Sequence, residues 1–144
     1  MAPPVIVDTN VVVAAVLTAR TDSPVARVLD GMLAALFPFA ISDALMAGYR
    51  TVLRRPSLRK AHGLSSDELD IILVELAQRG IVIAPVPAPP APDPGDQHLW
   101  ELLAARDDLL LVTAEKKLQR DRAMGPRILT PATYIERWLR SNRA

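Results

Sequence analysis

The first strand-like segment of the chain, residues 5–7, is an apolar Val-Ile-Val run that leads directly into Asp8. A strand that is buried on both faces reads as such a continuous run, which is typical of parallel sheets in α/β proteins. Open α/β sheets bind their ligands just beyond the C-terminal ends of the strands. Asp8 is therefore well placed to hold a metal ion. The alternative is that Asp8, Thr9 and Asn10 only cap the helix that follows.

Strand and helix patterns alternate along the whole chain. Strand candidates lie at residues 5–7, 37–41, 81–83, 109–112 and 127–129. Helical patterns lie at residues 10–18, 23–36, 42–55 and 65–80, from 96 onward, around 116–118 and from 130 onward. This alternation favours a parallel sheet with helices on both faces. We expect a three-layer α/β/α fold around a central parallel sheet of about four or five strands.

A proline-rich stretch interrupts this pattern between residues 85 and 94, where six of ten residues are proline. Proline is excluded from helix interiors and from central strands, so we expect an extended surface connector. The segments on either side each have too few strands to close a sheet alone. With 144 residues in total, we expect residues 1–144 to form a single domain.

The amino-acid composition excludes several classes of function. The chain contains no cysteine, which excludes disulfides, thiolate nucleophiles and cysteine-ligated zinc. No apolar stretch approaches the length of about 20 residues that spans a bilayer, and the N-terminus does not resemble a signal peptide. We therefore expect a cytoplasmic protein that does not enter a membrane.

The net charge is only +1, so binding to nucleic acid requires local basic patches. Two candidate patches occur, one at residues 50–62 and one at residues 116–127. Their members are Arg50, Arg54, Arg55, Arg59, Lys60 and His62, and Lys116, Lys117, Arg120, Arg122 and Arg127. Either patch can instead be an ordinary solvated helix face. Among these residues, Arg54, Arg55, Lys116 and Lys117 are our candidates for contact with the phosphate backbone of a nucleic acid.

Three acidic residues are expected to meet at one edge of the sheet. Asp8 ends the first strand, Glu115 follows the strand at 109–112, and Asp96 starts the helix that leads into that strand. Carboxylates that are brought together repel one another unless a cation compensates their charge. Carboxylate oxygens select Mg²⁺ or Mn²⁺, which can assist hydrolysis at phosphorus. Each residue also has an ordinary alternative role as a helix cap or first-turn acid. We interpret the nearby His98 as structural.

Four segments together resemble the PIN-domain family, in particular the toxin components of bacterial toxin–antitoxin pairs. They are residues 5–10 (VIVDTN), 49–56 (YRTVLRRP), 92–99 (PDPGDQHL) and 111–115 (LVTAE). The resemblance covers nearly the whole chain. It implies a ribonuclease that depends on Mg²⁺ or Mn²⁺.

The resemblance also assigns roles to residues of the candidate site. Asp8, Asp96 and Glu115 would bind the metal, with Asp93 as an auxiliary acid, and Asn10 and Thr113 would position these groups by hydrogen bonds. Toxin-type members of the family are generally homodimers, and a small antitoxin protein neutralises them at the acidic groove.

The chain departs from the family pattern at two positions. Gly48 stands directly before Tyr49, where a glutamate is usual, and Glu115 replaces a more common aspartate. Asp43 is more than one helical turn from position 48, which makes it a doubtful substitute. The loss of a carboxylate at Gly48 leaves open a second hypothesis, in which the protein binds RNA or an antitoxin without turnover.

A third class of function is a phosphoacceptor receiver domain. This class requires an acidic pair early in the chain, and residues 1–7 contain no acidic residue.

Overall fold

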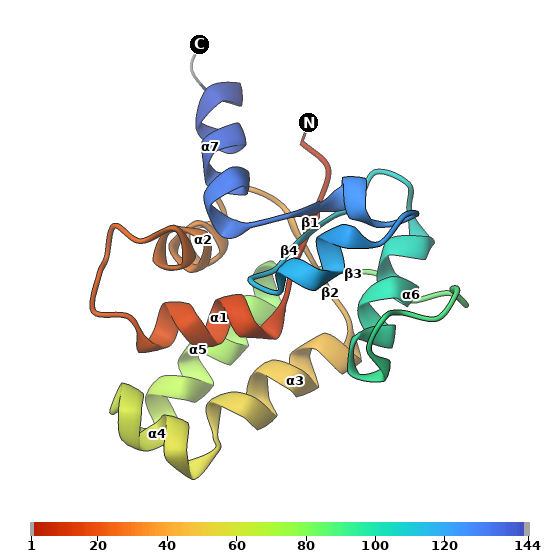
Figure 1. Cartoon of the computed structure of the whole chain (residues 1–144). Helices are drawn as coiled ribbons and strands as arrows, with labels where there is room; N and C mark the ends of the chain where they lie inside the picture. The colour runs from red at the N-terminus through yellow and green to blue at the C-terminus, as the bar shows by residue number, and fades with distance from the viewer. Residues whose placement is uncertain (1, 143–144) are drawn as a thin grey trace.

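A five-stranded sheet, parallel throughout, forms the centre of the protein, and the computed structural model describes residues 2–142. The strand order is β3-β2-β1-β4-β5. The strands are β1 (Val5–Val7), β2 (Phe39–Ile41), β3 (Ile81–Val82), β4 (Leu110–Val112) and β5 (Ile128–Leu129). Helices flank the sheet in a three-layer α/β/α arrangement, which confirms the predicted fold class (Figure 1).

Seven α-helices and three short 3-10 helices accompany the strands within the described residues, and α7 follows the last strand. The α-helices are α1 (Thr9–Leu17), α2 (Pro24–Leu33), α3 (Asp43–Leu53), α4 (Pro56–His62), α5 (Ser66–Arg79), α6 (Gln97–Ala105) and α7 (Pro131–Ser141). The 3-10 helices are η1 (Pro94–Asp96), η2 (Lys116–Arg120) and η3 (Gly125–Arg127). No described helix is long and apolar enough to cross a membrane.

Four α-helices begin with a capping side chain at the positions where the sequence pattern predicts a helix to start. The side chains of Ser23, Ser42 and Thr130 each accept a hydrogen bond from the first turn of their helix. Ser65 and Glu68 form a complete capping box at the start of α5. These local interactions fix where four of the seven α-helices begin.

Two helix boundaries differ from the prediction. Helix α2 ends at Leu33 rather than near Leu36, because the backbone turns at Ala35, whose φ angle of 54° lies in the left-handed region. Pro56 ends α3 as predicted, but it also occupies the first turn of α4, a helix that the sequence analysis did not predict. Proline is favoured at that position because the first helical N–H has no partner in the helix.

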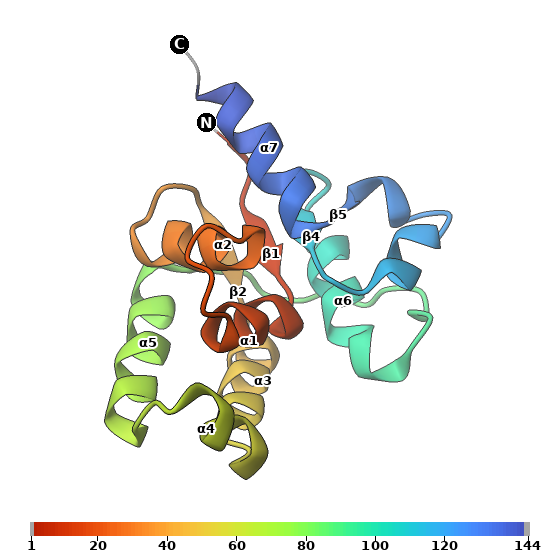
Figure 2. The ribbon, with the colours of Figure 1, turned by 60° about the vertical axis from the view of Figure 1, so that its left-hand side comes forward.

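The core is built on both faces of the sheet. All three residues of β1 are fully buried, as the apolar run predicts. Trp100 is also a core residue, whereas Trp138 is half-buried and packs edge-on against Phe37 with ring centroids 6.4 Å apart. Figure 2 shows α7, which carries Trp138, beginning beside α2 and running away from the sheet.

The proline-rich connector lies on the surface, as predicted, and Gln97 holds it in place. The Gln97 side chain accepts a hydrogen bond from Ala91 N over 2.7 Å and donates to the carbonyls of Ala88 and Pro89. Because Gln97 directly follows η1, this clamp fixes the loop that carries Asp93 and Asp96.

Arg127 joins the end of α6 to the segment that leads into β4. Its guanidinium donates hydrogen bonds to the backbone carbonyls of Leu103, Arg106 and Leu109, at the end of α6 and the approach to β4. Burial lowers the pKa of Arg127, and nearby Asp107 and Asp108 oppose that shift. Tertiary contacts therefore occupy the donors of Arg127, a structural role that the grouping with the basic patch did not indicate.

Candidate metal centre

Asp8, Asp96 and Glu115 converge at the C-terminal edge of the sheet. Each offers one carboxylate oxygen, and these three oxygens lie within 4.8 Å of one another. The convergence follows from strand pairing: β1 and β4 are parallel neighbours with Val7 opposite Val112, so both chains leave the sheet at one place. Asp96 reaches the same edge from η1, which precedes α6.

Asp8 has two structural partners and is 6% exposed. It caps α1, because its Oδ1 accepts a hydrogen bond of 2.7 Å from Thr9 N. Its Oδ2 accepts a hydrogen bond of 2.8 Å from the Thr113 hydroxyl. The cap and the candidate ligand are thus the same carboxylate, and the capping interaction holds it toward the other two acids.

Thr113 and Asn10 form the network that positions these acids. The buried Thr113 Oγ1 accepts hydrogen bonds from Asn10 Nδ2 over 3.3 Å and from Glu115 N over 3.0 Å, in addition to donating to Asp8. Asn10 Oδ1 in turn accepts from Ala114 N. The Thr113 hydroxyl therefore uses its single donor and both acceptor positions within the centre.

Asp93 lies beside the centre but outside the group of three. Its side chain accepts a hydrogen bond of 2.8 Å from Gly95 N and so caps η1. This bond, followed by one from Lys117, lowers the pKa of Asp93. The structure therefore places Asp93 as a residue that shapes the loop around Asp96.

The pKa values of two of the three acids, Asp96 and Asp8, are raised, which favours the binding of a cation. Burial, followed by repulsion from Glu115 and Asp8, raises the pKa of Asp96 to about 7. The pKa of Asp8 is also raised, mainly by burial, although the hydrogen bonds from Thr113 and Thr9 oppose that shift. Carboxylates that are buried together and repel one another are stabilised by a bound divalent cation. The donor set of hard oxygen ligands fits Mg²⁺ or Mn²⁺.

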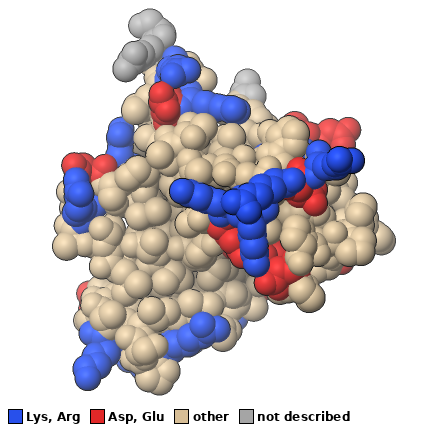
Figure 3. Space-filling model, in the orientation of Figure 1, with Lys and Arg blue, Asp and Glu red and all other residues tan. Residues whose placement is uncertain are grey.

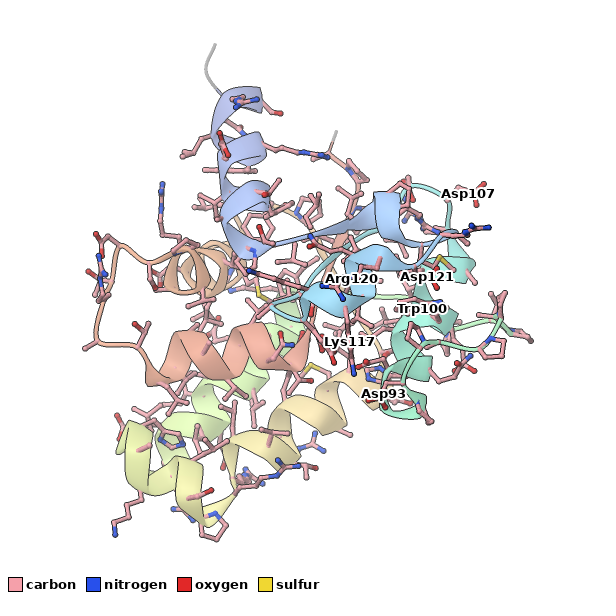
Figure 4. All side chains as sticks on the ribbon, viewed as in Figure 1. Asp93, Trp100, Asp107, Lys117, Arg120 and Asp121 are labelled. Atoms are coloured by element: carbon pink, nitrogen blue, oxygen red, sulfur yellow. The ribbon has the colours of Figure 1, made fainter. Side chains whose placement is uncertain are left out.

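The positively charged side chain of Lys117 lies beside the acids of the centre. Lys117 Nζ is 3.1 Å from Glu115 Oε1 and 3.5 Å from Asp93 Oδ2. Figure 4 shows Lys117 extending from η2 toward Asp93, and Figure 3 shows Lys and Arg side chains gathered beside the acidic ones on this face.

The other candidate RNA contacts are distributed unevenly. Lys116 is exposed on η2, close to the centre in sequence. Arg55 is exposed between α3 and α4, while Arg54 makes an ion pair with Asp70 of α5. One patch therefore borders the acids, and the other lies at the far end of α3.

Position 48 faces the first turn of α1. A Cβ atom built on Gly48 would lie 2.9 Å from Thr9 Oγ1, the side chain next to Asp8. A longer side chain at this position would therefore lie beside the candidate metal centre. Asp43 is exposed at the start of α3 and is not a member of the acidic group.

An open groove of about 400 Å³ leads away from the carboxylates. The three acids and Asn10 line one end of it. Its remaining wall is largely apolar and includes Val13, Ala14 and Leu17 of α1 and Val52 of α3. The sequence analysis missed this wall, although the four-residue spacing of Val13 and Leu17 places them on one helix face.

The sequence analysis also assigned no role to Tyr49. It is fully buried, and its hydroxyl donates a hydrogen bond to the Val7 carbonyl directly before Asp8. Burial and the nearby Asp8 carboxylate raise the pKa of Tyr49, so the phenol keeps its proton. Tyr49 thereby fixes the end of β1 from the side of α3.

His98 lines a cavity separate from the groove, but it lies near enough to Asp8 for each group to affect the pKa of the other. The cavity has a volume of about 430 Å³ and is also lined by Ser42, Asp43, Glu101 and residues 82–85. Its Nδ1 atom is buried without a hydrogen-bond partner among the described residues, and burial lowers the pKa of the ring.

Comparison with known proteins identifies the family of the chain. Neither a search of curated proteins nor a search of solved structures returned a significant match. The family model of the PIN domain matches residues 4–117, a span that includes Asp8, Asp96 and Glu115. The chain therefore belongs to the PIN domain family.

Proposed function

We propose that this protein is a metal-dependent endoribonuclease that acts as the toxin of a toxin–antitoxin pair. The observation that carries the proposal is the convergence of Asp8, Asp96 and Glu115 within 4.8 Å at the C-terminal edge of the sheet. PIN domains are generally metal-dependent nucleases, and the matched span contains all three residues.

The three carboxylates would hold Mg²⁺ or Mn²⁺. When bound, such an ion supplies an activated water and stabilises negative charge on the phosphodiester during hydrolysis. Hydrogen bonds made by Thr113 and Asn10 hold the Asp8 side chain and the Glu115 backbone in place. The ligands would therefore move little when the ion binds.

The groove supports the choice of a nucleic-acid substrate. Its acidic end would receive the scissile phosphate together with the ion, and its apolar wall along α1 offers a surface on which bases can pack. The exposed Lys116 on η2 would hold the phosphate backbone near the cut. Lys117, whose ammonium is paired with Glu115 and Asp93, would add positive charge beside it. Arg55 and Arg54 would contact RNA farther along α3.

The toxin role adds two partners. A small antitoxin protein would cover the acidic groove and exclude RNA, and the protein would act as a homodimer in the cytoplasm. Exposed apolar side chains on α5 and β3 offer a surface for protein contact, namely Ile71, Val74, Ile81 and Val82.

The alternative is a protein that binds RNA or an antitoxin without turnover. Gly48 is the observation that favours it, because position 48 faces Thr9 beside the centre and provides no carboxylate. Asp43 does not fill this gap within the described residues. The two hypotheses share the fold and the groove and differ in whether three carboxylates suffice for catalysis.

Cleavage of a mixed RNA pool by the purified protein separates these hypotheses. Wild type, Asp8→Asn and Gly48→Glu are compared in EDTA, Mg²⁺ and Mn²⁺. We expect wild type to cut RNA only with a divalent ion and Asp8→Asn to be inactive while still folded, since asparagine preserves the shape of the cap. An inert wild type beside an active Gly48→Glu would mean that the site has lost catalysis, and binding without turnover would become the leading function.

A further inference from the structure

Lys117 is placed between two carboxylates that come from different segments of the chain. Its ammonium lies 3.1 Å from Glu115 of the β4 end and 3.5 Å from Asp93 of the proline-rich connector. The neighbouring Lys116 makes no ion pair within the described residues. The two adjacent lysines of η2 therefore have different surroundings, although both are exposed.

The Glu115 carboxylate belongs to two groups at once. It is one of the three acids that converge within 4.8 Å, and its Oε1 also contacts the Lys117 ammonium. In sites that hold two metal ions, the ions lie roughly 3.5–4 Å apart and share ligands. Glu115 is shared in a similar way, because it belongs to the three-acid group and also contacts the Lys117 ammonium.

The remaining acids around the centre do not build another cation position. Asp93 is already paired with Lys117, and Gly48 supplies no ligand on the side of α3. Within residues 2–142, the only cluster of potential metal ligands is the group of Asp8, Asp96 and Glu115.

From these contacts we propose that the Lys117 ammonium takes the place of a second metal ion, so that the centre binds one divalent ion. The inference rests on the proposed metal centre and adds its stoichiometry and the role of one residue. Lys117 is a positioning residue in this account: it neutralises Glu115 and Asp93 and holds the connector against η2.

The test is the stoichiometry of Mn²⁺ binding to wild type, Lys117→Gln and the matched control Lys116→Gln. Isothermal titration gives the number of sites and the affinity, and electron paramagnetic resonance distinguishes an isolated Mn²⁺ from a coupled pair. Thermal melting checks that each variant is folded, which we expect because both lysines are exposed.

We expect one isolated Mn²⁺ in wild type and in Lys116→Gln. In Lys117→Gln the freed carboxylates should accept a second, coupled ion, and the first should bind roughly tenfold more tightly because a repelling charge is gone. Two ions in wild type, or one ion in Lys117→Gln at any affinity, would overturn the role of Lys117. Absence of Mn²⁺ binding to all three proteins would instead contradict the metal centre itself.

Discussion

Thr113 Oγ1 donates a hydrogen bond of 2.8 Å to Asp8 Oδ2, and this bond joins the ends of β4 and β1. The two residues are 105 positions apart in the sequence. Both are buried, and the same hydroxyl also accepts from Glu115 N and Asn10 Nδ2. One threonine therefore sets the orientation of one candidate ligand and the backbone of another.

Replacing Thr113 by valine should weaken both stability and metal binding. Valine keeps the shape of threonine but leaves the Glu115 N–H without its partner and Asp8 with one hydrogen bond fewer. We expect the free energy of unfolding to fall by about 1–3 kcal/mol. Mn²⁺ affinity should fall roughly tenfold, as is typical when a partner of a metal ligand is removed.

Chemical denaturation and Mn²⁺ titration measure these two effects. Thr51→Val is the matched control, because Thr51 is exposed on α3 and makes no side-chain hydrogen bond within the described residues. Equal behaviour of Thr113→Val and Thr51→Val would show that the Thr113 hydroxyl does not organise the centre.

The raised pKa of Asp96 predicts that the metal-free protein loses stability as pH rises. The folded protein holds a proton on Asp96 up to about pH 7, whereas the unfolded chain releases it near the ordinary value of 3.8. This contribution to folding is complete below the unfolded pKa and is lost as pH rises through the folded pKa. The raised pKa of Asp8 acts in the same direction.

Thermal melts in EDTA between about pH 5 and pH 8 test this dependence. We expect the melting temperature of wild type to fall across this range and that of Asp96→Asn to fall less. The lowered pKa values of Asp93 and Asp108 act at more acidic pH. The lowered pKa of His98 acts within this range and in the opposite direction, and both proteins share it, so the comparison with Asp96→Asn isolates the effect of Asp96. A wild-type profile as flat as that of Asp96→Asn would contradict the account. Added Mn²⁺ should stabilise wild type most at the alkaline end.

Arg127 should prove to be a structural residue. Arg127→Met removes the donors for three backbone carbonyls, and we expect a loss of about 3 kcal/mol in the free energy of unfolding. Arg122→Met, which removes the same charge from an exposed side chain, should change stability little. Unchanged stability of Arg127→Met, together with an affinity for RNA weaker than that of Arg122→Met, would show that Arg127 serves RNA binding rather than the fold.

The sheet and the helix starts could be predicted because their causes are local. A Val/Ile run such as residues 5–7 indicates a buried strand, and Ser65 with Glu68 indicates a helix start. The early end of α2 was not predictable in this way. Gly31 packs so tightly against Phe37 that a Cβ would lie 2.3 Å from the ring, a contact that depends on the tertiary fold.

The acids of the candidate site could be predicted from the sequence, but the contacts of the residues around them could not. Parallel pairing of the apolar strands brings Asp8 and Glu115 to one edge, and this could be inferred from the sequence. The ion pair of Lys117 with Asp93 joins a helical turn to a loop 24 residues away, which no periodicity indicates. The donors of Arg127 are likewise occupied by contacts that only the folded chain creates.

Gly48→Glu tests whether the centre lacks a ligand. The new side chain would begin 2.9 Å from Thr9 Oγ1, so we would combine it with Thr9→Ala to remove the conflict. We expect the double variant to bind Mn²⁺ more tightly than Thr9→Ala alone, because a fourth carboxylate would enter the centre. Unchanged affinity, measured by titration, would show that position 48 does not reach the ion.

The most direct test of the central claim is the chemical nature of the ends that the protein leaves on an end-labelled RNA. Hydrolysis at the carboxylate centre predicts linear phosphate ends, formed with Mn²⁺ or Mg²⁺ and absent both in EDTA and with Asp96→Asn. Asp96 suits this test because its side chain makes no hydrogen bond to the backbone of the described chain. Cleavage that persists in EDTA or in Asp96→Asn, or that leaves 2′,3′-cyclic phosphates, would contradict a metal-dependent ribonuclease built on Asp8, Asp96 and Glu115.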